Sequence, residues 1–212
     1  MAHTQSPPAV YPPGFLLNEV LMPRMLVCVD GLNIFHALRD LDEDLLKIDL
    51  MALSKFIADG HGISEVRVQY FTAKIRHLGN SVKEAQHKYL AELRSSGVEV
   101  VLGEFRSQSQ NCPHCETKFW KHQEKQTDVA LATELVKGAL NGKYEEILLF
   151  SADSDFLPAV QFVTQECPWI TIRIVSTVAY LRPVYATLVR ASQGQIRLSA
   201  ELVSKFQFGS TI

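Results

Sequence analysis

Four aspartates lie where the chain is expected to leave a buried strand or to enter a helix. Asp30 closes one apolar run, and Asp153 and Asp155 directly follow another. Asp128 opens a helical pattern between these two runs. In a parallel α/β sheet the carboxyl ends of the strands share one edge, and ligands bind at that edge. Because carboxylates are hard oxygen donors, the set predicts a Mg²⁺ or Mn²⁺ site that acts on phosphates.

The elements expected to position these aspartates are strands that alternate with helices. Apolar runs predict strands at residues 25–30, 66–71, 98–102, 146–150 and 171–175. Helical spacing predicts helices at residues 33–40, 49–58, 81–95, 128–140, 156–165 and 179–190, with an edge strand and a short helix within 196–208. Such alternation indicates a three-layer α/β/α fold with a mostly parallel sheet.

The composition is that of a single globular domain. The 212 residues are 47% hydrophobic and 21% charged, and the formal charge of −2 gives no overall attraction to nucleic acid. Any nucleic-acid binding would therefore depend on a local basic patch. No apolar run approaches the roughly 20 residues of a membrane helix, and the start of the chain lacks signal-peptide features. We expect a flexible tail over residues 1–23, one domain over 24–212, a cytoplasmic location and no membrane partner.

Three short segments, in this order along the chain, resemble the NYN domain family, a branch of the PIN-like ribonucleases. They are Val-Asp-Gly-Leu-Asn at 29–33, Lys-Gln-Thr-Asp-Val-Ala at 125–130 and Ser-Ala-Asp-Ser-Asp-Phe at 151–156. The resemblance runs from about Met25 to about Ser176. It implies a PIN-like fold with a divalent-metal site that cuts RNA, and the residues carried over are Asp30, Asn33, Asp128, Ser151, Asp153 and Asp155.

The chemistry of phosphodiester hydrolysis can be assigned to the same residues. One or two Mg²⁺ or Mn²⁺ ions would activate a water and relieve charge in the transition state. Asp30 and Asp153 end two strands expected to be neighbours, and Asp128 would complete a shared metal site. Asn33 is a candidate for holding a phosphate oxygen or a metal-bound water. Ser151 can hydrogen-bond a carboxylate or a water beside the metal.

Most of these residues also have a purely structural interpretation. Asp128 and Asp155 both precede helical segments and would serve as N-caps, and Asn33 could cap the first helix. Asp30 is the hardest to explain in this way, because a charge that ends an apolar strand needs a partner. Asp30 and Asp153 are therefore the strongest metal-ligand candidates.

Basic and aromatic side chains are expected on the same side of the sheet as the carboxylates. Lys74 and Arg76 follow the second strand, while Trp120, Lys121 and Lys125 lie in the segment just before Asp128. Phosphate contacts and base stacking would both be available there, and stacking favours single-stranded RNA. The alternative is a solvated loop whose aromatic side chains pack inward.

A Cys-x-x-Cys pair, Cys112 and Cys115, is half of a tetrahedral zinc site, and His122 is a candidate third ligand. No second cysteine pair completes the site, so a structural Zn²⁺ is one option and a loop staple without metal is another. The same tetrapeptide occurs in thiol oxidoreductases, but that interpretation leaves the aspartates unexplained. We expect residues 111–126 to be an irregular, substrate-facing flap that brings cations and an aromatic ring beside the metal.

The predicted function is a metal-dependent ribonuclease with RNA as its partner. The alternative is a catalytically quiet RNA-binding or regulatory module on the same fold. A phosphatase-like hydrolase is less consistent with the sequence, because its aspartate pair would be expected on the first strand. Assembly into a homo-oligomer is left open.

Overall fold

Seven strands form one sheet in the order β4-β3-β2-β1-β5-β6-β7. The structure is a computed structural model that describes residues 22–76, 78–111, 115, 117–177 and 183–209. Six neighbouring strands, β3 to β7 in that order, are parallel, and β4 pairs antiparallel with β3. The strands are β1 Arg24–Asp30, β2 Glu65–Ala73, β3 Glu99–Asn111, β4 Lys118–Lys125, β5 Glu146–Phe150, β6 Thr171–Thr177 and β7 Gln195–Leu198.

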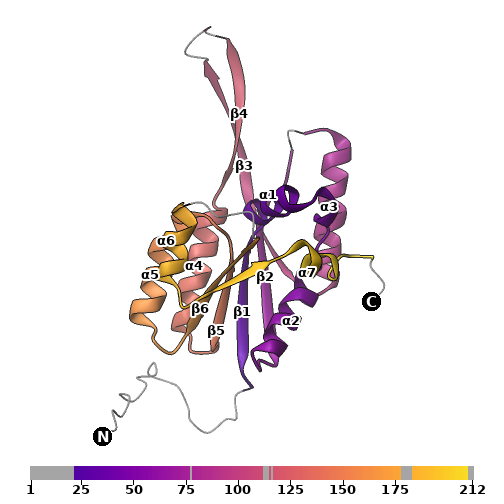
Figure 1. Ribbon diagram of the computed structural model, residues 1–212. Coiled ribbons are helices and arrows are strands. Elements are labelled where there is room, and N and C mark those ends of the chain that lie inside the picture. Colours follow the sequence, from indigo (N-terminus) through magenta and orange to yellow (C-terminus); the bar gives the residue numbers. More distant parts are fainter. Residues whose placement is uncertain (1–21, 77, 112–114, 116, 178–182, 210–212) are drawn as a thin grey trace, which may run out of the picture.

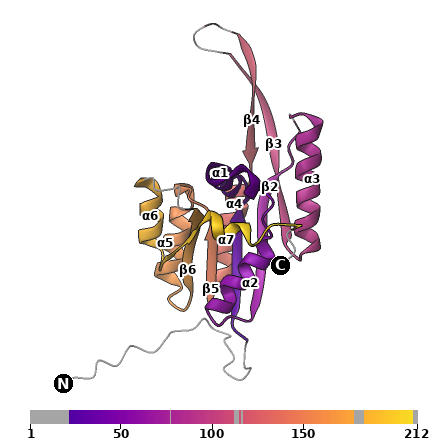
Figure 2. The same ribbon diagram turned by 45° about the vertical axis from the view of Figure 1, so that its right-hand side comes forward.

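Helices cover both faces of the sheet, as Figures 1 and 2 show. The helices are α1 Gly31–Leu41, α2 Leu50–Gly60, α3 Asn80–Ser95, α4 Thr127–Leu140, α5 Leu157–Glu166, α6 Pro183–Ala191 and α7 Ala200–Ser204, with short 3₁₀ turns η1 Glu43–Leu45 and η2 Ser154–Phe156. Helices α1, α2, α3 and α7 contribute to one hydrophobic core, and α4, α5 and α6 contribute to the other. The predicted three-layer α/β/α fold is confirmed.

Strand β1 shows why both faces are covered. Met25 and Val29 belong to the core beneath α1, α2 and α3, whereas Leu26 and Cys28 belong to the core beneath α4 and α5. All four side chains are fully buried. Because successive side chains of a strand point to opposite faces, an uninterrupted apolar run requires a layer of helices on each side.

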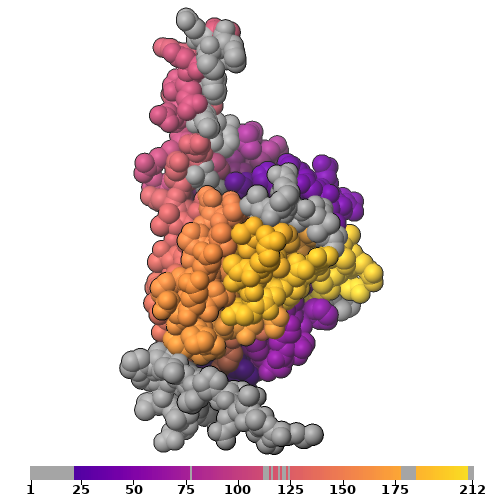
Figure 3. Space-filling view, turned by 60° about the vertical axis from the view of Figure 1, so that its left-hand side comes forward, coloured from indigo at the N-terminus to yellow at the C-terminus, as the bar shows by residue number. Residues whose placement is uncertain are grey.

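The segment expected to be an irregular flap is instead largely a β-hairpin. Strand β3 pairs with β2 only as far as Gly103, and residues 104–111 then pair with β4 alone. We call residues 104–111 and 118–125 the arm. At about 3.3 Å per residue its eight cross-strand pairs extend roughly 25 Å. Figure 3 shows the arm projecting as a narrow column beyond the body of the protein.

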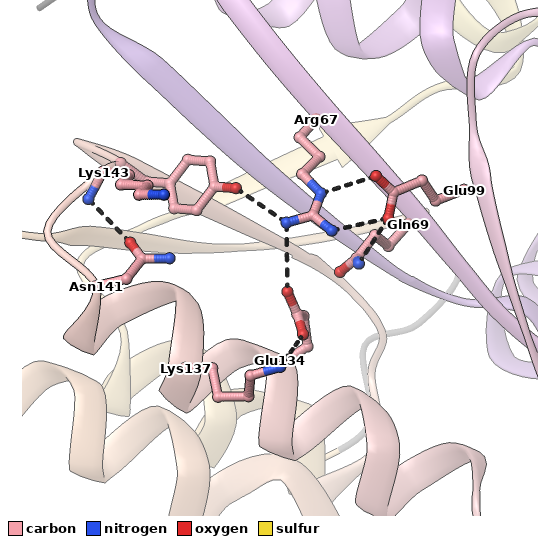
Figure 4. Close-up of polar contacts among 8 residues, drawn as sticks. Arg67, Gln69, Glu99, Glu134, Lys137, Asn141 and Lys143 are labelled. Carbon is pink, nitrogen blue, oxygen red and sulfur yellow. Dashed lines mark hydrogen bonds and ion pairs between the residues drawn. The ribbon is translucent and has the colours of Figure 1, made fainter.

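A polar network fastens the arm-side edge of the sheet to α4 (Figure 4). Arg67 on β2 donates two hydrogen bonds to Glu99 on β3, at 3.0 and 2.8 Å. Its third nitrogen donates to Tyr144 at 3.4 Å and lies 3.7 Å from Glu134 on α4. Gln69 also donates to Glu99, at 3.0 Å. The network therefore ties the first residue of β3 to β2 and α4, at the end of β3 that lies away from the arm.

The helix boundaries depart from the prediction by a few residues. Helix α6 begins at Pro183 in the described part of the chain, and the earlier part of the predicted helix 179–190 lies outside it. Almost all of the predicted tail, residues 1–21, also lies outside the described residues. Within the described ranges, no helix combines the length and apolarity that crossing a membrane requires.

Candidate active site at the carboxyl edge of the sheet

Asp30 joins the end of β1 to the start of α1 and has two hydrogen-bond donors. Its Oδ1 accepts from the backbone N–H of Asn33 at 3.1 Å, which makes it the N-cap of α1. Its Oδ2 accepts from the hydroxyl of Ser151 at 3.0 Å. Asp30, rather than Asn33, therefore caps the first helix. The carboxylate that seemed hardest to explain structurally has a structural role after all.

The end of β5 supplies the second part of the site. Strands β1 and β5 are neighbours, as predicted, with Val29 paired to Phe150. The hydroxyl of Ser151 accepts a hydrogen bond from the Asp153 N–H at 3.1 Å while it donates to Asp30. Ser151 is thus a buried bridge between the two strongest metal-ligand candidates.

Asp153 also shapes the turn that follows β5. Its Oδ1 accepts from the N–H of Asp155 at 3.0 Å and caps the 3₁₀ turn η2. Asp155 lies inside that turn, and the residue that precedes α5 is Phe156, which makes no side-chain cap. The prediction that Asp155 caps the following helix is wrong, because the 3₁₀ turn intervenes. Asp155 is exposed, and its charge contributes to raising the pKa of Asp128.

Asn33 lies one turn into α1 and connects that helix to the end of β5. Its Oδ1 accepts from the N–H of Ala152 at 3.0 Å. The bond occupies the amide oxygen and leaves the amide NH₂ as the group that can donate to another molecule. The predicted contact of Asn33 with a phosphate oxygen would use this NH₂ group.

Asp128 lies in the first turn of α4 and is not its N-cap, so the capping interpretation of this residue is wrong. The helix begins after Gln126, which has φ of 77° and makes no side-chain cap. Among the described residues Gln126 is the only non-glycine with positive φ. Such a backbone costs on the order of 1–3 kcal/mol and is often found at functional sites. Here it turns the chain sharply from β4 into the helix that carries Asp128.

The four carboxylates are close enough to affect one another electrostatically. Burial is the main reason that the pKa of Asp30 is raised to about 6, and the hydrogen bonds from Asn33 and Ser151 oppose that rise. The charges of Asp128 and Asp153 raise the pKa of Asp30 further.

Asp128 responds to the same environment. Burial raises its pKa, followed by the charges of Asp153 and Asp155, while Lys125 lowers it. A cluster of carboxylates that repel one another in this way is stabilised by a cation, which makes the donor set suitable for a hard divalent metal.

Carboxylate oxygens fit Mg²⁺ or Mn²⁺, and the number of aspartates that would bind one ion is a separate matter. Within the described ranges, no three or more His, Cys, Asp or Glu side chains are grouped so that they could hold a metal ion. A magnesium ion keeps several waters and needs only one or two carboxylates, so Asp30 and Asp153 could hold one without a third ligand. The assignment of Asp30, Asp128 and Asp153 to a single ion stays a prediction.

Basic side chains flank the base of the arm. Lys74 and Arg76 are exposed just beyond the end of β2. Arg106, Lys125, Gln126 and Val129 are among the residues that line a depression of about 500 Å³ beside the start of α4. Its lining residues flank Asp128 in the sequence and include two cations, Arg106 and Lys125, but no aspartate.

Trp120 and Lys125 occupy different parts of the same strand. Trp120 lies opposite Ser109, far out on the arm, and 66% of its surface is exposed. Lys125 is five positions further along, or roughly 17 Å away along an extended strand. The ring is therefore displayed on the arm and does not lie beside the carboxylates, contrary to the expectation for the flap.

The candidate zinc ligands are only partly described. Cys112 lies outside the described residues, and neither the His122 side chain nor that of Lys121 is placed. Cys115 is exposed and its Sγ donates to the Thr117 hydroxyl at 3.3 Å. The zinc site stays a prediction.

Two residues that position the site carry no signal in the sequence. Gly103 lies so close to the β4–α4 connection that a Cβ there would meet the Lys125 carbonyl oxygen at 2.6 Å. Gln126 adopts its left-handed conformation without being Gly or Asn. The Gly103 requirement arises from a contact with a segment more than 20 residues away, which a local pattern does not reveal.

Comparison with known proteins supports the same class of protein. The family model of the NYN domain matches residues 24–178. A solved protein of unknown function from Vibrio parahaemolyticus aligns with 91% of this chain and 100% of its own, with a TM-score of 0.60 and 16% identity. This likeness shows the fold alone. The fold is that of the PIN-like nuclease class.

Within that class, the chain belongs to the NYN domain family. It is also 26% identical over 174 residues to 6-hydroxy-3-succinoylpyridine 3-monooxygenase HspA of Pseudomonas putida. The match covers 66% of this chain and 55% of that relative, so it spans about half of the relative's length.

Proposed function

We propose that this protein is a divalent-metal-dependent ribonuclease that hydrolyses phosphodiester bonds of single-stranded RNA. The observation that carries the proposal is the hydrogen-bonded series Asp30–Ser151–Asp153 at the carboxyl edge of an NYN domain. Asp128 adds a further carboxylate close enough to raise the pKa of Asp30. Clustered carboxylates that repel one another at a ligand-binding edge are typical of metal sites that act on phosphates.

Each residue of the site has a distinct role in this proposal. Asp30 and Asp153 would hold a Mg²⁺ or Mn²⁺ ion, with Asp128 and Asp155 nearby to bind it directly or through water. When bound, the ion would supply an activated water and charge relief at the phosphate. The Ser151 hydroxyl holds the Asp30 carboxylate in one orientation. The free NH₂ group of Asn33 would donate to a phosphate oxygen.

In this proposal, RNA binds to the arm and to the base of the arm. Arg106 and Lys125 line the depression beside α4 and would contact phosphates. Lys74, Arg76 and Lys121 would add further phosphate contacts. Trp120 would stack on a base several nucleotides away, since its ring is exposed on the arm. Stacking of this kind requires an unpaired base, which supports single-stranded RNA as the substrate.

The second candidate is an RNA-binding module without cleavage activity. It is favoured by the finding that no group of three metal-binding side chains occurs among the residues described. In that case the basic arm would still bind RNA, and the carboxylates would serve as caps of α1 and η2.

Incubation of the purified protein with end-labelled single-stranded RNA in Mn²⁺, Mg²⁺ or EDTA distinguishes the two. We expect cleavage with a divalent ion, none in EDTA, and loss of cleavage in Asp30→Asn and Asp153→Asn. These substitutions keep the shape of the side chain and remove the anionic ligand. The matched control is Asp59→Asn, an exposed aspartate on α2, which should cleave like the native chain.

Cleavage that persists in both variants would contradict the mechanism. If the native chain and all three variants bind RNA and none of them cleaves it, the protein is the binding module.

A further inference from the structure

A second candidate site lies between α1 and α3, on the face of the sheet that these helices share. It is a cavity of about 520 Å³ with walls from α1, α3 and the end of β2, and no aspartate lines it. Its volume is within the range of roughly 300–1,000 Å³ that is usual for small-molecule sites. Four of its lining residues are large apolar side chains with considerable exposure: Leu32, Phe35, Leu78 and Val82.

Exposed apolar side chains gathered around one cavity are uncommon, and they mark a binding surface. Aromatic rings also line this cavity, including Phe35, Tyr70 and Phe105. Rings of this kind pack against a flat molecule by offset stacking or edge contacts. The shape and lining therefore suit a planar aromatic body.

Cations surround the apolar lining. Arg39, Lys47 and Lys88 all line the cavity, against a single carboxylate, Glu92. Within the described part of the chain, neither Lys47 nor Lys88 makes an ion pair. Arg39 lies over the Phe35 ring, 5.9 Å from its centre, and contacts Asp40 only at 3.8 Å. An anionic group on a bound molecule would complement this excess of positive charge.

Glu92 provides one specific polar feature. Its Oε2 is shielded from solvent and has no hydrogen-bond partner among the described residues. A buried acceptor without a donor costs on the order of 1–3 kcal/mol, and more when it is charged. Glu92 lines the cavity, so a rotation of its carboxylate would let a hydroxyl or N–H group on a bound molecule satisfy this oxygen.

Other polar groups of the lining are already engaged. Gln86 accepts from the Ile75 N–H at 2.9 Å and donates to the Ala73 carbonyl at 3.0 Å. The Tyr89 hydroxyl donates to the Ile48 carbonyl at 3.0 Å. Glu92 is thus the acceptor that stands out as unsatisfied.

We propose that the cavity between α1 and α3 binds a small aromatic acid: a planar ring with a hydrogen-bond donor and an anionic side group. The ring lies among the apolar and aromatic side chains, the donor pairs with Glu92, and the anion pairs with Lys47 or Lys88. The cavity adjoins the proposed nuclease centre through Gly31 and Leu32, but no aspartate lines it, and the proposal does not depend on nuclease activity.

Calorimetric titration with three related probes tests the proposal. The probe 4-hydroxyphenylacetate has the ring, the donor and the acid; phenylacetate lacks the donor, and 2-(4-hydroxyphenyl)ethanol lacks the acid. We expect 4-hydroxyphenylacetate to bind about tenfold more tightly than either, because a hydrogen bond or ion pair with a charged partner is lost in each analogue. In Glu92→Met the advantage over phenylacetate should disappear.

Two tryptophan substitutions on α3 provide a matched pair. Ala85 is exposed and lines the cavity, so Ala85→Trp should fill its mouth and abolish binding. Ala91 is exposed on the same helix and does not line it, so Ala91→Trp should leave binding unchanged. No binding of any probe, unchanged binding in Ala85→Trp, or tighter binding of adenosine monophosphate than of 4-hydroxyphenylacetate would each overturn the proposal.

Discussion

At the scale of single residues, Asp30 combines a structural and a chemical role. One oxygen caps α1 and the other accepts from Ser151, so these two hydrogen bonds alone hold the carboxylate in place. Burial nevertheless makes its ionised form unfavourable, and its pKa is raised to about 6. A carboxylate that is held in place but poorly stabilised as an anion is suited to a cation. The same features predict how the metal-free protein responds to pH.

Asp30→Asn should stabilise the metal-free protein at neutral pH. Between the usual pKa of 3.8 and about 6 the native state holds more protons than the unfolded state, so native stability falls as pH rises through this window. The difference corresponds to roughly 3 kcal/mol as an upper bound. The variant avoids this cost and keeps the cap oxygen, so urea unfolding in EDTA at pH 7 should show a gain of about 1–3 kcal/mol.

The gain should vanish below about pH 4, where the native aspartate is protonated in both states. Added Mn²⁺ should stabilise the native chain and not the variant. A variant that is equally stable at pH 4 and pH 7 relative to the native chain would show that Asp30 is not buried as a strained anion.

Ser151→Ala should act in the opposite direction. It removes the hydroxyl that lowers the pKa of Asp30 and leaves the Asp153 N–H without its acceptor. We expect a loss of about 1–3 kcal/mol at pH 7 and a pKa of Asp30 above 6 by NMR titration. Ser154→Ala, in the turn three residues further along, is the control. An Asp30 pKa that does not move would mean that the hydroxyl has no electrostatic role.

At the scale of elements, the joint between the arm and α4 determines where Asp128 lies. Gly103 is the last residue of β3 that pairs with β2, and it packs against the β4–α4 connection. A Cβ at this position would lie 2.6 Å from the Lys125 carbonyl oxygen and 2.7 Å from Cγ2 of Thr127. The first of these is a backbone atom, which can move only if the whole connection moves.

Gly103→Ala should therefore destabilise the protein by about 1–3 kcal/mol and displace the start of α4. Cleavage of RNA should fall by more than the loss of folded protein explains, since Asp128 moves with the helix. The control is Gly60→Ala in α2, where a Cβ meets nothing within 4 Å and should be neutral or stabilising. Equal stability of both variants would show that the connection adapts without strain.

The same elements show which features a sequence can predict. The parallel strands and most helices were predictable because each buries a continuous or periodic apolar pattern, as β1 does. The arm was not predictable, because every residue from Arg106 to Asn111 is polar and the segment has no apolar face that would indicate a strand. Its strand pairing depends on a partner, β4, that is also mostly polar apart from Phe119 and Trp120.

The candidate site also has features that the sequence predicts and features that it does not. The proximity of Asp30 to Asp153 was predictable, because it requires only that β1 and β5 be neighbours. The capping roles were not, because they depend on local geometry: the 3₁₀ turn displaces Asp155 from the start of α5, and the left-handed Gln126 displaces Asp128 from the cap of α4.

At the scale of the whole molecule, charge is distributed unevenly. The chain as a whole has a formal charge of −2, but the sequence of the arm has four basic and two acidic residues, a net of +2. Those residues are Arg106, Lys118, Lys121 and Lys125 against Glu104 and Glu124. The body, excluding the arm, then has a charge of −4. RNA should be repelled by most of the surface and attracted to the arm, whose base carries Arg106 and Lys125 in the depression beside the start of α4.

This distribution predicts a shallow but measurable dependence of RNA binding on salt. If the four basic residues of the arm each contact a phosphate, log K should fall with log[salt] with a slope of about −3, since each contact on a single strand contributes about −0.7. Affinity should then decrease about 50-fold between 50 and 200 mM salt. Fluorescence anisotropy of labelled single-stranded RNA, measured in EDTA to prevent cleavage, gives the slope directly.

The double variant Lys118→Gln, Lys125→Gln should reduce the magnitude of this slope by about 1.4, because two phosphate contacts are removed. Lys55→Gln, an exposed lysine on α2, should leave the slope unchanged. Trp120→Ala should weaken binding at every salt concentration without changing the slope, because stacking releases no counterions. A double variant with the native slope would place RNA on another surface and separate the arm from substrate binding.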